Sequence, residues 1–373
     1  MEKIKTYAWY FPNWHPTSLN DLWHGKGWTE WECVKCARPR FEGHLQPKKP
    51  LWGYEDESDP KVFAKKIETA HKYGVDGFIF DYYWFKNEGP YRRDCLDKGF
   101  LGAENNELCE FSVMWCNHDP IYVHPAAYRH QNPQLTSGDV DAQFVYEVTQ
   151  YCIDNYFPRK NYQRVDGKVF FGIWDMNKFV ANFGGLDGAA TVLNDFRSRA
   201  AKAGFEVHLA AHKNSVPGFA AGDKEMCRTA LKVLGLDSLF SYSWKSPQPA
   251  VWPKVDYAQF REYNIPLFEK DTELSSVPLN ITVSTGWDSS PRTVQSDIYE
   301  NTGYPFCSIT VDNTPQEVEK SFAAAKAFLE SDKHTGKFFT LSTWNEWTEG
   351  NYFEPDELYG YGYLEAFQKI FGN

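Results

Sequence analysis

The sequence predicts a single (β/α)8 barrel, and three observations lead to this fold class. Eight short runs have the length of strands, helical patterns fill most intervals between them, and most runs are apolar throughout, as in parallel strands covered on both faces. The predicted strands are residues 6–11, 77–83, 111–116, 169–174, 206–211, 239–244, 280–285 and 338–344. No linker composition or repeat indicates a second domain, so residues 1–373 are expected to form one domain.

Helices are predicted from capping signals and from apolar residues at helical spacing. Asp59 and Pro60 place an N-cap and a first-turn Pro before one apolar stripe, and Gly74 ends it. Residues 314–317 (TPQE) form a capping box at the start of another helix. The predicted helices are residues 59–74, 139–154, 187–203, 223–234, 256–263, 314–329 and 364–371. The interval between residues 84 and 111 mixes Gly, Pro and charged residues and predicts no clear helix.

Composition restricts the possible partners. The 39 Lys and Arg against 50 Asp and Glu give a net charge of −11 without a long basic run, which argues against nucleic acid or an anionic membrane. No apolar run reaches the roughly 18 residues of a membrane span. The first predicted strand begins at residue 6, which leaves no room for a signal peptide, so the expected location is cytoplasmic. A secreted or periplasmic location would require a longer precursor. Composition does not specify the oligomeric state.

Metal and cofactor signals are weak. The eight cysteines are spread along the chain, and the CxxC at residues 33–36 has no second pair, so reduced thiols are expected. No HExxH and no Gly-rich phosphate loop occurs. Asp139-Val140-Asp141 resembles the DxD of metal-dependent glycosyltransferases, but it opens an amphipathic helix, which favours a capping role. We therefore expect no metal and no cofactor.

The stretch after the eighth predicted strand combines acids with aromatic residues, and it reads WNEWTEGNYFEP over residues 344–355. Paired carboxyls can transfer protons or attack carbon, and aromatic faces can stack on sugar rings. A turn between Glu346 and Glu349 would bring both carboxyls to one side. We expect Glu346 and Glu349 to be the catalytic pair of a sugar-cleaving site. The alternative is a polar loop whose acids favour the N-terminus of the following helix.

Aromatic residues beside an acid, an amide or a histidine follow nearly every predicted strand. In barrel enzymes the site lies on the loops at the carboxyl ends of the strands, so these residues are candidates for substrate binding. The long first loop, residues 13–56, is Trp-rich and polar, and loops of this length are usually functional. The candidates are Trp14, His15, Trp28, Glu30, Trp31, Asp81, Tyr82, Trp84, Trp115, Asn117, His118, Trp174, Asp175, His212, Tyr242, Trp244, Trp287, Asp288, Asn345 and Tyr352.

Each kind of candidate also has a structural interpretation. The histidines fit rim hydrogen bonding better than metal ligation, because the ten histidines of the chain are scattered. Asp81 and Asp175 could cap the turns that follow them. About half of the tryptophans could pack the rim of the barrel instead of binding sugar.

With these residues assembled, the sequence resembles the WbsX-type family. That family is often labelled glycosyltransferase-like and is related to the endo-α-mannosidase glycoside hydrolases (family 99). The resemblance covers nearly the whole chain as an ordered series of motifs. They are YFPNWHP (10–16), GKGWTEW (25–31), FEGHLQP (41–47), YYWF (82–85), RVDGK (164–168), GWDSSPR (286–292), WNEWTEG (344–350), EPD (354–356) and YGY (359–361).

The resemblance implies a (β/α)8 barrel that acts on α-linked, mannose-like glycosides. On the pattern of the related endo-α-mannosidases, Glu346 is the base that deprotonates the sugar's 2-hydroxyl. The alkoxide then attacks C1 and gives an anhydro-sugar with net retention. Glu349 protonates the leaving oxygen and later deprotonates water, for which it needs a raised pKa from the nearby Glu346 and from burial under Trp347. One departure bears on sugar specificity: where the family often has WANENW, this chain has WCNHDP, so His118 stands at a family Glu position.

Two other functions remain open on the sequence. A transferase of surface-polysaccharide assembly would agree with the family's label and would require a sugar-nucleotide donor. A barrel without catalysis would bind an oligosaccharide and leave it intact. The glycoside hydrolase is favoured because both Glu residues of the eighth-strand motif are present.

Overall fold

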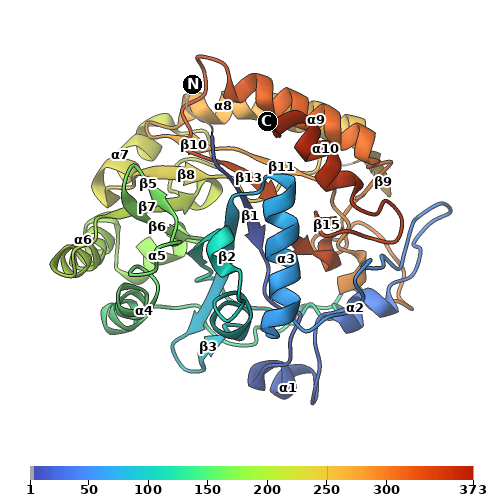
Figure 1. Ribbon diagram of the computed structural model, residues 1–373, viewed down its shortest axis with the longest axis horizontal. Coiled ribbons are helices and arrows are strands. Elements are labelled where there is room, and N and C mark those ends of the chain that lie inside the picture. The colour runs from blue at the N-terminus through green and yellow to red at the C-terminus, as the bar shows by residue number, and fades with distance from the viewer. Residues whose placement is uncertain (1–3, 250, 373) are drawn as a thin grey trace.

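The computed structural model describes residues 4–249 and 251–372 and forms a parallel barrel surrounded by helices (Figure 1). The sheet order is β10-β8-β7-β6-β4-β2-β1-β13-β11. Its two ends, β10 and β11, are separated in the chain by Ile281 alone, so the nine segments occupy eight positions and nearly close the ring. The segments are β1 (Thr6–Tyr10), β2 (Gly77–Phe85), β4 (Glu110–Trp115), β6 (Lys168–Ile173), β7 (Val207–His212), β8 (Ser238–Phe240), β10 (Leu279–Asn280), β11 (Thr282–Ser284) and β13 (Phe339–Ser342).

All eight predicted strands are present, and their pairings around the ring are parallel. The barrel fold is therefore confirmed. The helical runs between them include the seven predicted ones, which are α3 (Pro60–Tyr73), α4 (Ala142–Asn155), α6 (Leu186–Lys202), α7 (Lys224–Leu234), α8 (Tyr257–Leu274), α9 (Pro315–Leu329) and α10 (Gly362–Phe371). That residues 1–373 form one domain stays a prediction.

Side-chain caps begin several of these helices as the sequence indicates. Asp59 accepts a hydrogen bond from the backbone N–H of Lys61, and Thr314 accepts one from Glu317. Asp141, the second acid of the DxD sequence, accepts one from Phe144 and so caps α4. α8 was expected to end at residue 263 but continues to Leu274, and Pro266 lies inside the helix.

Several short elements were not predicted. The long first loop contains α1 (Ser18–His24) and α2 (Trp31–Cys36), and α5 (Met176–Asn182) follows β6. The interval after β2 forms an antiparallel hairpin with β3 (Gly89–Tyr91) and then a π-helical turn, η1 (Cys95–Phe100). The remaining elements are β5 (Arg164–Val165), β9 (Lys254–Asp256), β12 (Ile309–Val311), β14 (Asn345–Glu346), β15 (Asn351–Tyr352) and the 3-10 turns η2 (Asn106–Leu108), η3 (Lys213–Ser215), η4 (Ser290–Arg292) and η5 (Trp347–Glu349).

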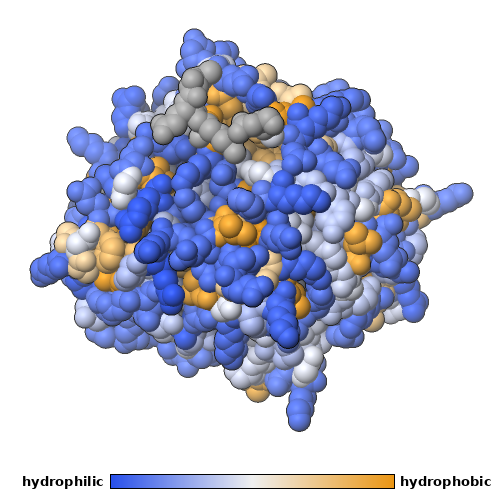
Figure 2. All heavy atoms as spheres, viewed as in Figure 1, coloured by the Kyte–Doolittle hydropathy of each residue, from blue (hydrophilic) through white to orange (hydrophobic). Residues whose placement is uncertain are grey.

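The surface contrasts with the aromatic interior. Figure 2 shows a face covered mainly by hydrophilic side chains, with small and separate hydrophobic patches. Inside, large aromatic side chains such as Trp9, Phe78 and Trp344 are fully buried. All eight cysteines are free thiols. Among the described residues, no helix is both long and apolar enough to cross a bilayer.

Candidate active site

A tight turn after β13 positions Glu346 and Glu349. The Asn345 side chain accepts a hydrogen bond from the Phe11 N–H at 2.8 Å and donates one to the Phe11 carbonyl at 2.9 Å, which fixes the turn to β1. Glu346 ends β14, and Glu349 ends the 3-10 turn η5. Gly350 then adopts φ +61, and a Cβ there would lie 2.7 Å from the Asp288 Cβ, so only glycine allows this close approach. Both carboxyl groups consequently lie on one side of the chain.

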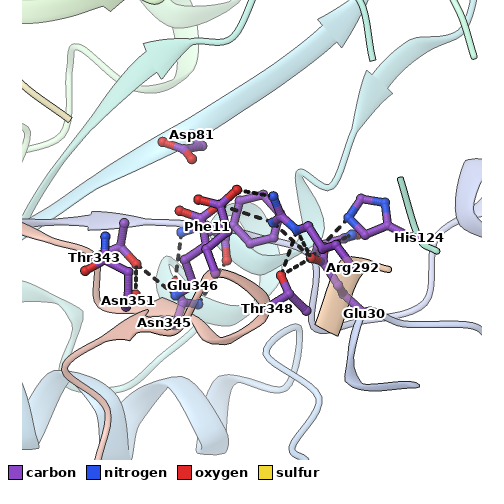
Figure 3. A network of polar contacts seen from close by, with 12 residues as sticks. Phe11, Glu30, Asp81, His124, Arg292, Thr343, Asn345, Glu346, Thr348 and Asn351 are labelled. Carbon is purple, nitrogen blue, oxygen red and sulfur yellow. Dashed lines mark hydrogen bonds and ion pairs between the residues drawn. The ribbon is translucent and has the colours of Figure 1, made fainter. Parts of the chain in front are cut away.

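One guanidinium group binds both carboxylates. The Arg292 Nη2 lies 3.2 Å from the Glu346 Oε1, and the Arg292 Nη1 donates to the Glu349 Oε1. The Tyr304 hydroxyl donates a second hydrogen bond to the same Glu349 oxygen at 2.9 Å. Figure 3 shows Arg292 between Glu346 on one side and Glu30 on the other. Arg292 therefore joins the eighth-strand turn to the loop after the seventh strand.

Glu30 of the first loop is a third carboxylate on Arg292. Its Oε1 lies 3.0 Å from the Arg292 Nη2 and 3.1 Å from the His124 Nε2, and its Oε2 accepts from the Asn13 amide at 2.6 Å. Burial alone would raise the pKa of Glu30, but His124 and Arg292 together hold it well below its usual range. Glu30 is thus a fixed negative charge that anchors the first loop to the catalytic candidates.

Burial has the opposite effect on Glu346. Burial first, and then the neighbouring Glu349 carboxylate, raise the pKa of Glu346 well above its ordinary value, although Arg292 opposes them. A raised pKa was predicted from the sequence at Glu349, the other member of the pair. The structure assigns a raised pKa to Glu346, so this carboxyl holds a proton at higher pH than an exposed glutamate.

A tyrosine connects this pair to a further carboxyl group. The Tyr242 hydroxyl lies 2.8 Å from the Asp81 Oδ2 and 3.1 Å from the Glu346 Oε2. A phenol has one proton to donate, so one of the two carboxyls must itself be protonated for both contacts to be hydrogen bonds. Burial raises the pKa of Asp81 to about 8, against the opposing effects of the Tyr242 hydrogen bond and of Arg92. Asp81 is therefore a carboxylic acid at neutral pH.

The raised pKa of Asp81 predicts a pH-dependent stability that an asparagine removes. The folded state holds the proton up to about pH 8, whereas an unfolded aspartate loses it near pH 4, so the contribution to stability is complete below pH 4 and disappears toward pH 8. We expect the unfolding free energy of Asp81→Asn minus that of the wild type to increase between pH 5 and pH 8.5. The increase should be at least about 1 kcal/mol. Urea unfolding at both pH values measures this, with the exposed Asp332→Asn as control. Parallel pH profiles of wild type and Asp81→Asn would contradict the assignment.

The carboxyl groups line a cavity of about 370 Å³, a volume within the range of small-molecule binding sites. Of the predicted site residues, those that line the cavity are Asp81, His118, Trp174, Tyr242, Trp287, Glu346 and Glu349. His212 stacks on Trp174 with ring centroids 4.4 Å apart and supports that wall. Trp28 stacks on His24, a lining residue, at 4.0 Å. The aromatic and acidic side chains expected at the strand ends thus meet in one place.

Other predicted residues hold the rim together and do not line the cavity. The His15 Nδ1 forms a hydrogen bond with the Glu57 Oε1 at 2.9 Å, and the His44 Nε2 forms one with the Asp288 Oδ2 at 2.8 Å. The remaining contacts of this kind are Asn345 with Phe11, Asn117 with the Asp175 backbone, Asp175 as the N-cap of α5, Trp14 on Trp31, and Tyr352 on Trp347. The loop candidates thus form a supporting layer around the carboxylates.

A further group of predicted aromatics lies outside the barrel. Tyr82, Trp84 and Trp115 pack against Tyr156, Tyr151 and Phe144 in the region of α4, and Trp244 packs against Tyr257 and Phe260 of α8. The strand period explains this, because successive side chains point to opposite faces. Asp81 and Tyr83 line the cavity, whereas Tyr82 between them faces the helices.

Several lining residues were not predicted from the sequence, and these are Phe11, His24, Tyr83, Tyr91, Arg92, His124, Arg292 and Tyr304. Arg292 closes the GWDSSPR motif, so the signal for it was present, but no acid partner could be read from its position. Arg92, His124 and Tyr304 come from loops that pack over the barrel end, where residue type alone does not reveal direction.

Comparison with known proteins assigns the chain to a family. The family model described as glycosyltransferase WbsX matches residues 6–367, so the chain belongs to the WbsX family. A curated relative, the protein WxcX of Xanthomonas campestris pv. campestris strain B100, is 26% identical over 96% of this chain. The match covers 48% of WxcX, so the chain spans about half the length of that relative.

Solved structures share the fold. The family 99 endo-α-mannosidase of Bacteroides thetaiotaomicron, solved with bis-tris-propane, is 14% identical over 98% of this chain and 95% of its own, with a TM-score of 0.58. A protein described as glycoside hydrolase-like matches 100% of this chain and 95% of its own at 14% identity, with a TM-score of 0.64. The chain therefore has the barrel fold of glycoside hydrolases.

Proposed function

We propose that the protein is a retaining glycoside hydrolase that cleaves an α-linked, mannose-like bond in an oligosaccharide or polysaccharide. The observation that carries the proposal is the pair of buried carboxyls, Glu346 and Glu349, bound by Arg292 in an aromatic-lined cavity at the carboxyl end of the barrel. Proton donors and acceptors beside stacking surfaces are what glycosidic cleavage requires.

Retention follows from the proposed attack by the sugar's own 2-hydroxyl and not from a carboxylate nucleophile. The usual spacing rule for carboxyl pairs therefore does not apply. What supports the pairing is that Glu346 and Glu349 contact two nitrogens of the same guanidinium group.

The proposed chemistry follows the assignment that the family resemblance implies. Glu346 takes the proton of the sugar's 2-hydroxyl, and O2 forms a bond to C1 as the bond to the leaving oxygen breaks. Glu349 gives its proton to that oxygen. Water then attacks C1 and loses a proton to Glu349, while the bond from C1 to O2 breaks and O2 regains the proton from Glu346. Each Glu ends in its starting state.

The raised pKa of Glu346 adds a condition to this scheme. Its proton has to pass to Glu349 before the reaction, since the base must be ionised and the acid protonated. Both carboxyls contact Arg292, and the Tyr242 hydroxyl connects Glu346 with the protonated Asp81.

The two roles can be separated by the leaving group. A glycoside with 4-nitrophenol as leaving group needs little protonation, whereas its departure still needs the base. We therefore expect Glu349→Gln to cleave the nitrophenyl α-mannoside far better than a natural glycan, relative to wild type, and Glu346→Gln to lose both activities. Equal losses on both substrates for Glu349→Gln would contradict its role as the acid. The reverse pattern would exchange the two roles.

A transferase is the second candidate, and the description of the family as glycosyltransferases favours it. It predicts that a sugar nucleotide stabilises the protein in thermal-shift measurements and that no product forms without such a donor. The hydrolase proposal predicts neither. A barrel that only binds its glycan would show affinity for an oligosaccharide that survives incubation intact.

A further inference from the structure

A second arginine lies in the cavity wall, on the segment after β3. Arg92 is only 8% exposed and lines the cavity. Its backbone adopts φ +59, a left-handed conformation that is uncommon for a residue with a side chain. Three rings surround its guanidinium carbon, which lies 5.0 Å from the Phe11 centroid, 4.8 Å from Tyr83 and 4.4 Å from Tyr91. The fold thus holds this cation in one orientation.

Arg92 lacks the countercharge that a buried cation ordinarily has. In the described part of the chain no carboxylate forms an ion pair with it, and its Nε has no hydrogen-bond partner. Arg292 in the same cavity contacts three carboxylates. Arg93, the next residue, pairs with Asp97 at 2.8 Å outside the cavity. Contacts with three aromatic rings therefore take the place of the ion pair that a buried cation ordinarily has.

The acids in and beside the cavity have partners other than Arg92, and both Glu346 and Glu349 contact Arg292. Glu30 is bound by Arg292 and His124, and Asp119 pairs with Lys178 at 2.8 Å. Asp81 is uncharged at neutral pH because its pKa is about 8. No acid of the cavity is therefore paired with Arg92, and Glu30 acts on it only through its electrostatic field.

Two histidines respond to this charge. Burial is the larger cause and Arg92 adds to it, and together they lower the pKa of His118 to about 4. Burial, His124 and Arg92 lower the pKa of His24 to about 4 in the same way. Both imidazoles are neutral at pH 7 and can donate or accept one hydrogen bond each without adding charge. Arg92 is then the fixed cation at this wall of the cavity.

We propose that Arg92 binds an anionic substituent of the glycan, the carboxylate of a uronic acid or a sulfate ester, on a sugar next to the bond that is cleaved. The guanidinium fork matches the planar pair of oxygens of such a group. Arg92 and Arg292 pack on the same ring, that of Phe11, and the Arg292 guanidinium carbon lies 5.4 Å from its centroid. An anion bound by Arg92 would therefore lie near Glu346 and Glu349, which contact Arg292. The inference rests on the proposed glycosidase function and specifies its substrate class as an acidic glycan.

Monosaccharides that contain no bond to cleave test binding apart from catalysis. We would titrate the wild type with glucuronate, glucose 6-sulfate and glucose, and follow the fluorescence of the cavity tryptophans. At least one anionic sugar is expected to bind about tenfold or more tightly than glucose, because hydrogen bonds to a charged group are stronger than those between neutral groups. The preferred anion identifies the substituent. Equal affinities of all three sugars would overturn the proposal.

Neighbouring arginines supply matched variants. Arg92→Gln is expected to abolish the preference for the anionic sugar, whereas Arg93→Gln removes the same charge one residue away and is expected to retain it. An unchanged preference in a folded Arg92→Gln protein would overturn the proposal. If Arg92→Gln does not fold, Arg92→Lys keeps the charge without the fork, and a weakened but measurable preference for the anion is the result expected.

The outcome is independent of whether the protein is a hydrolase. Anion preference without cleavage of any glycan would keep the Arg92 site and overturn the proposed function. Cleavage of neutral mannans, together with equal sugar affinities, would keep the proposed function and remove the anion site.

Discussion

Glu346→Gln and Glu349→Gln are each expected to slow glycan cleavage by more than about a hundredfold. Positioned general acids and bases contribute roughly 10² to 10⁴ in rate, and glutamine keeps the size of the side chain while removing its proton chemistry. Both side chains are buried, so solvent cannot replace them. The rates are measured with whichever glycan the wild type cleaves.

The exposed Glu357→Gln, a few residues along the same segment, is the control and should retain the wild-type rate. The binding affinity for the glycan should change little in either catalytic variant. Full activity in a folded Glu349→Gln protein would remove it from the catalytic pair.

Arg292→Met is expected to cause the largest loss of stability, about 3–5 kcal/mol. Arg292 is buried and contacts Glu30, Glu346 and Glu349, so its removal leaves three carboxyls without their cation. Breaking a buried ion pair from one side is costly because the remaining charge is uncompensated. Urea unfolding of the variant and of the exposed Arg38→Met measures the difference.

A second variant separates charge from packing. If unpaired carboxylates cause the loss, Arg292→Met combined with Glu30→Gln should recover part of the stability, because one buried charge is removed. The double variant should lose less unfolding free energy than the two single variants lose together. A change below about 1 kcal/mol for Arg292→Met alone would show that the network contributes little.

The barrel could be predicted because its strands are nearly continuous apolar runs bounded by turn residues. The ends of α3 and α9 were readable from Asp59, Gly74 and Thr314, since capping is a local interaction. The short α1, α2 and α5 were not predicted, because a helix of six or seven residues depends on tertiary packing more than on propensity. The β3 hairpin was hidden by mixed composition.

The sequence predicted which residue types form the site, but it predicted less well which of these side chains point into the cavity. Glu346, Glu349, Asp81 and Tyr242 meet because parallel strands deliver their ends to one rim. Tyr82 was predicted to bind substrate, but its neighbour Tyr83 lines the cavity instead, since successive residues of a strand point to opposite faces. Long-range partners such as Arg292 with Glu30 depend on how loops fold over the barrel. A single sequence does not specify that.

The most direct test of the central claim is release of reducing ends from α-mannans and bacterial surface polysaccharides by the wild type and by Glu349→Gln. We expect the wild type to release reducing ends from at least one glycan without any sugar nucleotide, and Glu349→Gln to release almost none. Product formation that appears only with a sugar-nucleotide donor would contradict the hydrolase and establish a transferase.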